Sequence, residues 1–355
     1  MATQHFILVA GFNYENDKNP TFLQSCNNRM TRTLEKASAP ESMIFTLFDV
    51  AGGTVTQSKV DPKTKRRGWT KLQTFTAVTR ANYSSFKVGV ENHFDTKPAG
   101  IMSITDVYKF VEDIGASSDK GTVEELNFFS HGWMGGPILV NSFDPTSDDP
   151  SQPRNPNDKD ARIFKDFVPP TMDATALVNF NAAFAGDGFV WTWGCSFARA
   201  AHVVLSQLFK TSKYRTTPPA KIKDTDKFTL DFSEDAKTPS PTDDFNTIVN
   251  TLLPGGKKSG RSYTITVTFK QIKDLFHLEL DSAYAAVLAS STNITGIGAM
   301  PGTYADTEKN VRLPQMLVPQ RMPPYDDDLS ATVKFYTTFM GMSLDPENRG
   351  YGQFP

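Results

Sequence analysis

Cysteine is scarce in this sequence: Cys26 and Cys195 are the only two among 355 residues. Two thiols cannot build a disulfide framework, and they are too few for a cysteine-based zinc site. The five histidines show neither the i, i+4 pairing nor the His-x-x-Glu-His pattern of zinc enzymes. We therefore expect no metal centre, and the low cysteine content indicates a reducing compartment.

Long hydrophobic runs and an excess of charge of either sign are also missing. No apolar run approaches the ~20 residues that a membrane-spanning helix needs. Lys and Arg number 37, Asp and Glu number 39, and the formal net charge is -2. This balance gives no general attraction to nucleic acid or to an anionic membrane, so we expect neither as a partner. No basic leader precedes the first apolar stretch, which predicts a cytoplasmic protein or one exported by a leaderless route.

What the sequence does contain is a series of short apolar runs separated by helical patterns. Continuous apolar runs are typical of strands buried on both faces, and they cover residues 6–10, 43–50, 126–130, 189–193 and 284–289, with a more alternating run at 261–269. Apolar residues that recur three and four positions apart predict helices at 105–114, 196–209 and 270–281. This alternation predicts an α/β fold with a mostly parallel central sheet and helices on both faces.

Nothing marks a clean domain boundary, so we expect one elaborated domain over residues 1–355. Two polar segments are typical of inserted loops: 141–170, rich in Asp and Pro, and 210–254, rich in Thr, Pro and Asp. The segment 311–355 is rich in Pro, Tyr and Gly and predicts a strap on the surface. The acidic insert matches no EF-hand spacing, so calcium binding stays open. We expect this insert to gate a cleft or to offer a surface to a protein partner.

Two strand ends carry residues that can do chemistry. His131 follows the run at 126–130 and precedes Gly132, whereas Cys195 follows the run at 189–193 and precedes a helical pattern. In open α/β sheets the carboxyl ends of the strands are where ligands bind. A helix N-terminus and a nearby imidazole both favour a thiolate, so this pair predicts a cysteine nucleophile assisted by a histidine. The alternative is that Cys195 is a small core residue and His131 a structural one.

The sequence FFSHGWMGG, which contains His131 and Gly132, resembles the apolar-Ser-His-Gly-x-x-Gly-Gly element of caspase-like cysteine peptidases, the group of caspases, legumains and gingipains. The run FVWTWGC, which ends at Cys195, is similar to the later strand that carries the catalytic cysteine of that group. The resemblance implies a caspase-like fold in which Cys195 is the nucleophile and His131 protonates the leaving amine. It also implies an oxyanion hole formed by the N–H groups of Gly132 and Cys195, a polypeptide substrate and no organic cofactor.

The chain departs from that pattern in two places. Ser-Phe-Ala, rather than a nearby glycine, follows Cys195, and the acidic insert between the two elements is longer than is usual in the group. Substrate choice is less clearly marked: Asp306 or Asp49 would receive a basic side chain. An arginine pocket for acidic side chains is the other expectation, with three candidates: Arg66, Arg67 and Arg199. Each of these charges is equally typical of a solvated or capping position.

Two further functions stay open. A cysteine-nucleophile α/β-hydrolase would need a histidine later in the chain than Cys195, and His277 is its candidate, in a helical pattern where we expect it to be packed. A non-catalytic caspase-like scaffold would use the inserts as binding surfaces and leave the thiol inert. The glycine-rich run at 296–302 lacks the Lys-Ser/Thr of a phosphate loop, so it predicts no nucleotide cofactor.

Overall fold

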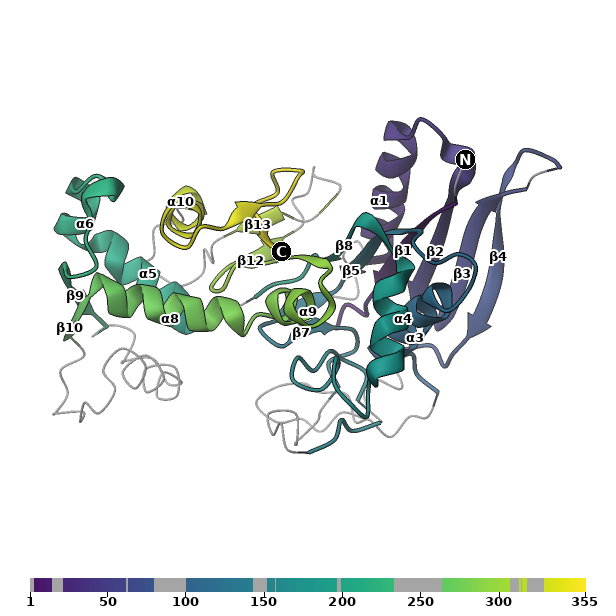
Figure 1. The fold of residues 1–355 in the computed structure, drawn as a ribbon, viewed down its shortest axis with the longest axis horizontal. Helices are drawn as coiled ribbons and strands as arrows, with labels where there is room; N and C mark the ends of the chain where they lie inside the picture. Colours follow the sequence, from purple (N-terminus) through teal and green to yellow (C-terminus); the bar gives the residue numbers. More distant parts are fainter. Residues whose placement is uncertain are drawn as a thin grey trace.

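The structure is a computed structural model, and it describes residues 3–14, 22–61, 63–79, 100–142, 152–156, 158–196, 199–232, 264–306, 313, 315–317 and 329–355. Its centre is a nine-stranded mixed sheet with the strand order β14-β15-β11-β8-β5-β1-β2-β3-β4 (Figure 1). The five middle strands are parallel: β11 (Thr295–Gly298), β8 (Phe184–Thr192), β5 (Val123–Phe129), β1 (Gln4–Ala10) and β2 (Met43–Asp49). The predicted α/β fold with a mostly parallel sheet is therefore confirmed.

Antiparallel strands extend the sheet at both edges. Beyond β2 lie β3 (Thr54–Val60) and β4 (Arg67–Thr74), and beyond β11 lie β15 (Gly352–Phe354) and β14 (Ser343–Leu344). The apolar runs at 6–10, 43–50, 126–130 and 189–193 correspond to β1, β2, β5 and β8, as predicted. These strands are buried on both faces, which is why their sequences are continuously apolar.

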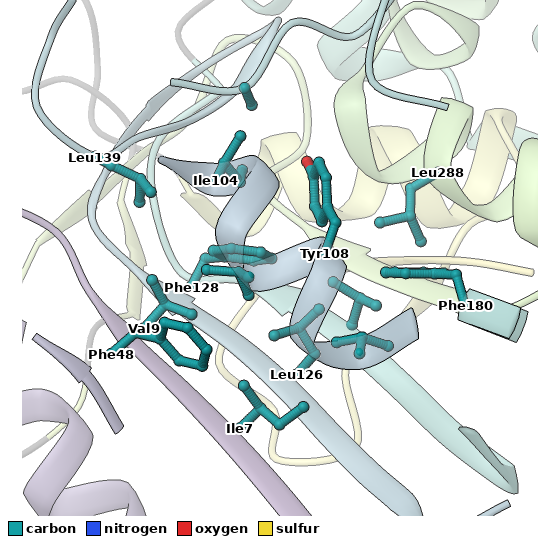
Figure 2. Packing of buried hydrophobic residues seen from close by; sticks show 14 of the residues in the cluster. Ile7, Val9, Phe48, Ile104, Tyr108, Leu126, Phe128, Leu139, Phe180 and Leu288 are labelled. Atoms are coloured by element: carbon teal, nitrogen blue, oxygen red, sulfur yellow. The ribbon is translucent and has the colours of Figure 1, made fainter. Parts of the chain in front are cut away.

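Helices cover both faces of the sheet. On one face α1 (Phe22–Lys36) packs Cys26 among side chains that include Phe6, Phe45 and Trp191. On the other face α3 (Ile104–Gly115), α4 (Ala174–Ala183) and α9 (Tyr284–Thr292) share one core with β1 and β5. Figure 2 shows this core, in which Tyr108 and Phe180 join the sheet residues Leu126 and Phe128. The short helix η1 (Pro40–Ser42) leads into β2.

The three predicted helices form close to their expected places. The helix at 105–114 is α3, where Ser103 and Asp106 form a capping box that satisfies the first backbone N–H groups. The helix at 270–281 is α8 (Phe269–Asp281), which has the same kind of capping box, from Thr268 and Gln271. The helix at 196–209 is α5 (Arg199–Lys210). Among the described residues, no helix is both long and apolar enough to cross a lipid bilayer.

A second hydrophobic cluster lies beside the sheet, to its left in Figure 1. It is built from α5, α8 and α10 (Leu329–Phe339) and from the hairpin of β9 (Lys227–Asp231) and β10 (Thr264–Thr268), with the short helices α6 (Ser212–Thr216) and η2 (Pro219–Lys221) alongside. The prediction of a loop over 210–254 is wrong where the chain forms α6 and β9. Alternate residues Phe228 and Leu230 of β9 point into the cluster, a pattern hidden by polar neighbours. Residues 233–254 lie outside the described residues.

Two predictions for the last part of the chain are also wrong. The run at 284–289 forms helix α9 instead of a strand, because alanine is the strongest helix former and Asn293 ends the helix in the left-handed conformation. The C-terminal strap is not confined to the surface, since β15 pairs with β11 inside the sheet and Tyr351 is fully buried. Apolar runs alone do not separate a buried strand from a buried helix.

The described part of the acidic insert contains three carboxylates that are buried instead of exposed to solvent. Asp160 accepts hydrogen bonds from the backbone N–H groups of Leu139 and Val140 at 2.7 and 2.8 Å. Asp158 pairs with Arg162, and Asp166 with Arg154. Asp158, Asp160 and Asp166 are at most 1% exposed. The expectation of an exposed loop is wrong for this part of the insert, while residues 143–151 and 157 lie outside the described residues.

The buried pair of Asp158 and Arg162 makes the stability of the fold depend on pH. Burial raises the pKa of Asp158 from its ordinary 3.8 to about 6. Between pH 3.8 and about 6 the carboxyl group of Asp158 keeps its proton in the folded chain but has lost it in the unfolded chain. The stabilisation that comes from this bound proton is therefore lost as pH rises through 6. We expect the unfolding free energy of the wild type, relative to Asp158→Asn, to fall by up to about 3 kcal/mol between pH 4 and 7. Chemical denaturation of both proteins across this range measures it, and a constant difference would contradict the prediction.

Candidate active site

The strand order determines which edge of the sheet can form a site. The chain passes from β1 to β2 on one side and then reaches β5 on the other side of β1. In open α/β sheets, ligands bind beyond the carboxyl ends of the strands where the order reverses in this way. Asn13, His131 and Cys195 all follow carboxyl ends there, after β1, β5 and β8.

The register of β5 and β8 places His131 and Cys195 at equivalent positions. Phe128 of β5 pairs with Thr192 of β8, and the N–H of Trp193 donates to the carbonyl of Phe128 at 2.9 Å. His131 and Cys195 each lie three residues beyond this pair. The two residues that are predicted to work together therefore follow adjacent strands, each three residues after the same pair.

Two glycines allow these strand ends to approach closely. A Cβ atom on Gly132 would lie 2.8 Å from the carbonyl oxygen and 3.1 Å from the nitrogen of Cys195. A Cβ atom on Gly194 would lie 2.9 Å from both the nitrogen and the Cα atom of Gly132. Contacts this short between a Cβ and backbone atoms are not tolerated, so only glycine fits at either position. The backbone beside His131 is thus in direct contact with the backbone that carries the thiol.

His131 begins a short hairpin made of β6 (His131–Trp133) and β7 (Gly136–Ile138). Its Nε2 lies 3.0 Å from Oδ1 of Asn13, and its ring contacts the rings of Tyr14 and Phe22 at centroid distances of 4.5 and 5.1 Å. An Asn oxygen at Nε2 favours the tautomer with the proton there, which presents Nδ1 as the basic nitrogen. The imidazole is therefore oriented by neighbours from the segment that follows β1 and from the start of α1.

Asn13 is a site residue that the sequence analysis missed. It follows the apolar strand β1 within the tetrapeptide Gly-Phe-Asn-Tyr, the same strand-end placement that identified His131 and Cys195. The backbone N–H of Gly11 donates to Phe129 at 2.8 Å, which sets the end of β1 against the end of β5. A polar residue just after a buried strand was the available signal.

Cys195 is half-buried, and a separate strand lies against its sulfur. The N–H of Ala305, in β12 (Tyr304–Asp306), lies 3.3 Å from Sγ of Cys195. β12 pairs with β13 (Gln315–Leu317) and is preceded by a backbone bridge between Ser196 and Thr303. A backbone N–H that donates to sulfur favours the thiolate over the thiol. Helix α5 is described from Arg199, and Cys195 lies before it, next to the bridge between Ser196 and Thr303.

The other cysteine has the opposite environment. Cys26 is fully buried in α1, and burial, assisted by the charge of Asp49, raises the pKa of its thiol well above the ordinary value. A thiol of this kind stays protonated and inert at neutral pH. The chain therefore contains an internal control for any reagent that tests Cys195.

A small pocket opens beside Cys195. Its lining includes Gly132 and Trp133 of the hairpin, Thr192 of β8, Tyr284 of α9 and Gly298 of β11. No Lys, Arg, Asp, Glu or His side chain of the described residues lines it. The pocket is bounded by the same strand ends that position His131 and Cys195.

The proposed specificity residues lie in different places. Asp306 directly follows Ala305 in β12, which brings its backbone next to the strand segment that contacts the thiol, while its side chain lies outside the described part of the structure. Asp49 lies at the end of β2, where its carboxylate accepts the N–H of Gly52 at 2.9 Å in a turn. β1 separates β2 from β5, so Asp49 is not brought to the thiol.

The candidate arginines and the late histidine are not gathered at Cys195. Arg67 donates to the backbone carbonyls of Met43, Ser58 and Pro40 at the far edge of the sheet. Arg66 lies in the turn between β3 and β4, and the side chain of Arg199 lies outside the described residues. His277 is exposed on α8, in contrast to the packed position that we expected.

Nothing among the described residues forms a metal site. No group of three or more His, Cys, Asp or Glu side chains in this part of the chain has the arrangement to hold an ion. In the acidic insert, the three buried carboxylates are bound instead by Arg154, Arg162 and backbone N–H groups. Calcium binding therefore receives no support from Asp158, Asp160 or Asp166.

Comparison with known proteins gives no relative: no protein family, no curated protein and no solved structure matches this chain. Any proposal for the function of this chain therefore depends on the geometry of the site. That geometry consists of an oriented imidazole, a half-buried thiol and two close-packed glycines at one edge of a parallel sheet.

The contact between Asn13 and His131 predicts how the imidazole should respond to substitution. Asn13→Ala removes the oxygen that orients Nε2, and we expect alkylation of Cys195 near pH 7 to slow about tenfold. Asn13→Asp keeps an acceptor oxygen, so its rate should stay within about threefold of wild type. Iodoacetamide kinetics, with each cysteine followed by peptide mass spectrometry, measure both rates. Equal slowing in the two variants would exclude an orienting role for the Asn13 oxygen.

Proposed function

We propose that this chain is a caspase-like cysteine peptidase that uses a dyad of His131 and Cys195. The observation that carries the proposal is their placement at equivalent positions beyond β5 and β8, with Gly132 and Gly194 in backbone contact between them. The resemblance of the two sequence motifs to those of caspase-like peptidases implies the same two residues, His131 and Cys195. A catalytic edge of this kind requires a nucleophile, a base and backbone donors within a few ångströms.

The proposed reaction is acyl transfer through a thioester. The thiolate of Cys195 attacks the carbonyl carbon of a peptide bond, so that a C–S bond forms and the electron pair moves to the carbonyl oxygen. The N–H groups of Gly132 and Cys195 stabilise this oxyanion, each worth about 3 to 4 kcal/mol when well placed. Collapse of the intermediate breaks the C–N bond while His131 donates a proton to the leaving amine. Water then hydrolyses the thioester, which releases the new carboxylic acid and restores the thiol.

Asp306 is the residue that we propose for selection of a basic side chain in the substrate. No charged side chain of the described residues lines the pocket beside the thiol, so a neighbouring segment is the candidate for charge selection. β12 is that segment, because Ala305 contacts the sulfur and Asp306 is the next residue. A carboxylate there would pair with a lysine or arginine of an extended polypeptide.

A non-catalytic caspase-like scaffold is the second candidate, and one observation favours it. β12 lies against the sulfur of Cys195, with the N–H of Ala305 at 3.3 Å and its carbonyl oxygen at 3.9 Å. If this contact persists whenever the protein is folded, no substrate carbonyl reaches the sulfur. Reactivity of the native thiol therefore separates the two functions.

The dyad predicts a thiol that reacts only when His131 is present. In native protein we expect Cys195 to alkylate with an apparent pKa below the ~8.5 of a free thiol, and Cys26 to remain unmodified. His131→Ala should slow alkylation of Cys195 at neutral pH by tenfold or more, because the base that favours the thiolate is gone. His277→Ala, an exposed histidine on α8, is the matched control and should leave the rate unchanged.

Peptide hydrolysis is the second measurement of the same proposal. Cys195→Ala should lower turnover of a cleaved peptide by at least about a thousandfold, since the nucleophile is lost. Retention of full activity in Cys195→Ala would sink the peptidase mechanism. A native thiol that stays unreactive until the protein unfolds would establish the scaffold instead.

The role of Asp306 is tested with paired peptides that differ only in one basic or neutral residue before the cleaved bond. Asp306→Asn should lower kcat/KM for the basic peptide by about ten- to a hundredfold, because a charge-assisted hydrogen bond is lost. The neutral peptide should be cleaved at the wild-type rate, and Asp49→Asn should affect neither peptide. Equal losses on both peptides would show that Asp306 does not read charge.

A further inference from the structure

The chain between the end of β8 and Cys195 is bound by the C-terminal segment. The hydroxyl of Tyr351 donates a hydrogen bond to the carbonyl of Trp193 at 2.9 Å. Tyr351 is fully buried, and its ring contacts those of Trp191 and Trp193 at centroid distances of 5.6 Å. Trp193 lies only two residues before Cys195. A residue near the C-terminus thus contacts the backbone of the strand end that carries the thiol.

This contact belongs to a closed set of interactions, which we name the strand-end ring. Its members are Trp193, Asn127, Glu125, Arg29, Glu347, Asp345 and Tyr351. The indole N–H of Trp193 donates to Asn127 at 2.9 Å, and the Asn127 amide donates to Glu125 at 2.9 Å. The indole of Trp193 is therefore fixed by hydrogen bonds on the sheet side.

Arg29 links the two halves of the strand-end ring. It makes a bidentate pair with Glu125 at 2.9 and 2.8 Å, and it also pairs with Glu347. Its guanidinium lies 5.6 and 5.7 Å from the ring centroids of Trp191 and Trp193, within reach of a cation–π interaction.

Asp345 completes the strand-end ring on the C-terminal side. It accepts the backbone N–H of Glu347 at 3.0 Å and that of Tyr351 at 2.9 Å. The C-terminal segment is therefore fixed at both ends of its turn before Tyr351 reaches Trp193.

The geometry points to Tyr351 as a positioning residue for Cys195, an inference that rests on the proposed peptidase function. The N–H of Trp193 is bound by Phe128 and its carbonyl by Tyr351, so both polar groups of this residue are fixed. The peptide plane between Trp193 and Gly194 then has one orientation, and Gly194 is pressed against Gly132. This plane contains the N–H of Gly194, and the contact of Gly194 with Gly132 restricts rotation about the Gly194 backbone. The direction of the next N–H, that of Cys195, depends on this restricted backbone. Tyr351 thus sets the oxyanion donor and the thiol without touching substrate.

Tyr351 acts as a hydrogen-bond donor over the whole working pH range. Burial raises its pKa well above the ordinary value, and the charges of Cys195 and Asp345 raise it further. The hydroxyl therefore keeps its proton, and its effect on Cys195 does not switch with pH in neutral solution.

The test compares Tyr351→Phe with Tyr336→Phe in the full chain. Tyr336 is the matched control, because it is equally buried and its hydroxyl donates to a backbone carbonyl, that of Pro301, outside β8. We expect both variants to lose similar unfolding free energy in urea, since each loses one buried hydrogen bond. Tyr351→Phe alone should lower kcat by about three- to tenfold while KM stays within about twofold. It should also raise the apparent pKa for alkylation of Cys195.

Hydrogen exchange gives a readout that does not depend on catalysis. A peptide that spans Trp193 and Cys195 should exchange its amides faster in Tyr351→Phe than in Tyr336→Phe. Glu347→Gln, which loosens the strand-end ring at Arg29, is the second variant and should change kcat and exchange in the same direction.

The outcomes separate this inference from the proposed function. Equal kcat losses in the two Tyr→Phe variants, or a kcat for Tyr351→Phe within twofold of wild type, would overturn the positioning role. If wild-type Cys195 is inert and cleaves nothing, the peptidase proposal fails on that result alone. The exchange comparison then decides whether Tyr351 fixes the strand end: faster exchange supports it and unchanged exchange overturns it.

Discussion

The structure of the site depends on one steric constraint, the contact between Gly132 and Gly194. A single added Cβ on either residue would lie within 2.9 Å of the partner strand's backbone, so the ends of β5 and β8 meet only because both positions lack a side chain. Parallel pairing up to Phe128 and Thr192 brings the strands to this point in equal register. The contact holds the backbone next to His131 against the backbone of Cys195. With a side chain at either position, the two strand ends could not approach this closely.

Buried charge supports this arrangement on both sides of the sheet. Ion pairs in a protein interior cost desolvation energy that their mutual attraction barely offsets, so they are poor sources of stability. In this protein, buried charged side chains hold segments of the chain in place. Asp160 binds the N–H groups of Leu139 and Val140, just past the hairpin that begins at His131. Arg29, on the opposite face, joins Glu125 of β5 to Glu347 of the C-terminal segment. In both cases a charge buried at a defined position fixes a segment that has little regular hydrogen bonding of its own.

How much could be predicted from the sequence differs between the parts of the site. The parallel strands and the placement of His131 and Cys195 follow from apolar runs that end in a reactive residue, because burial on both faces leaves a continuous local signal. Asn13 follows the same rule, but an amide is not reactive by itself and gains meaning only beside the imidazole. Helix α9 was mistaken for a strand since a six-residue apolar run fits either structure. The contact of Tyr351 with Trp193 joins residues 158 positions apart, and no local pattern encodes such a pairing.

The two cysteines show that place in the fold, not residue type, decides the chemistry. Cys26 is packed against the face of the sheet among apolar side chains, and burial and the charge of Asp49 both oppose a thiolate. Cys195 lies past the end of a strand, where the chain has left the ladder of the sheet and backbone N–H groups can turn toward a side chain. The N–H of Ala305 does so at 3.3 Å. In a parallel sheet, the backbone N–H groups along the strands are hydrogen-bonded within the sheet, whereas those past its carboxyl edge are available to other groups. An anionic group at that edge can therefore be bound by backbone N–H groups.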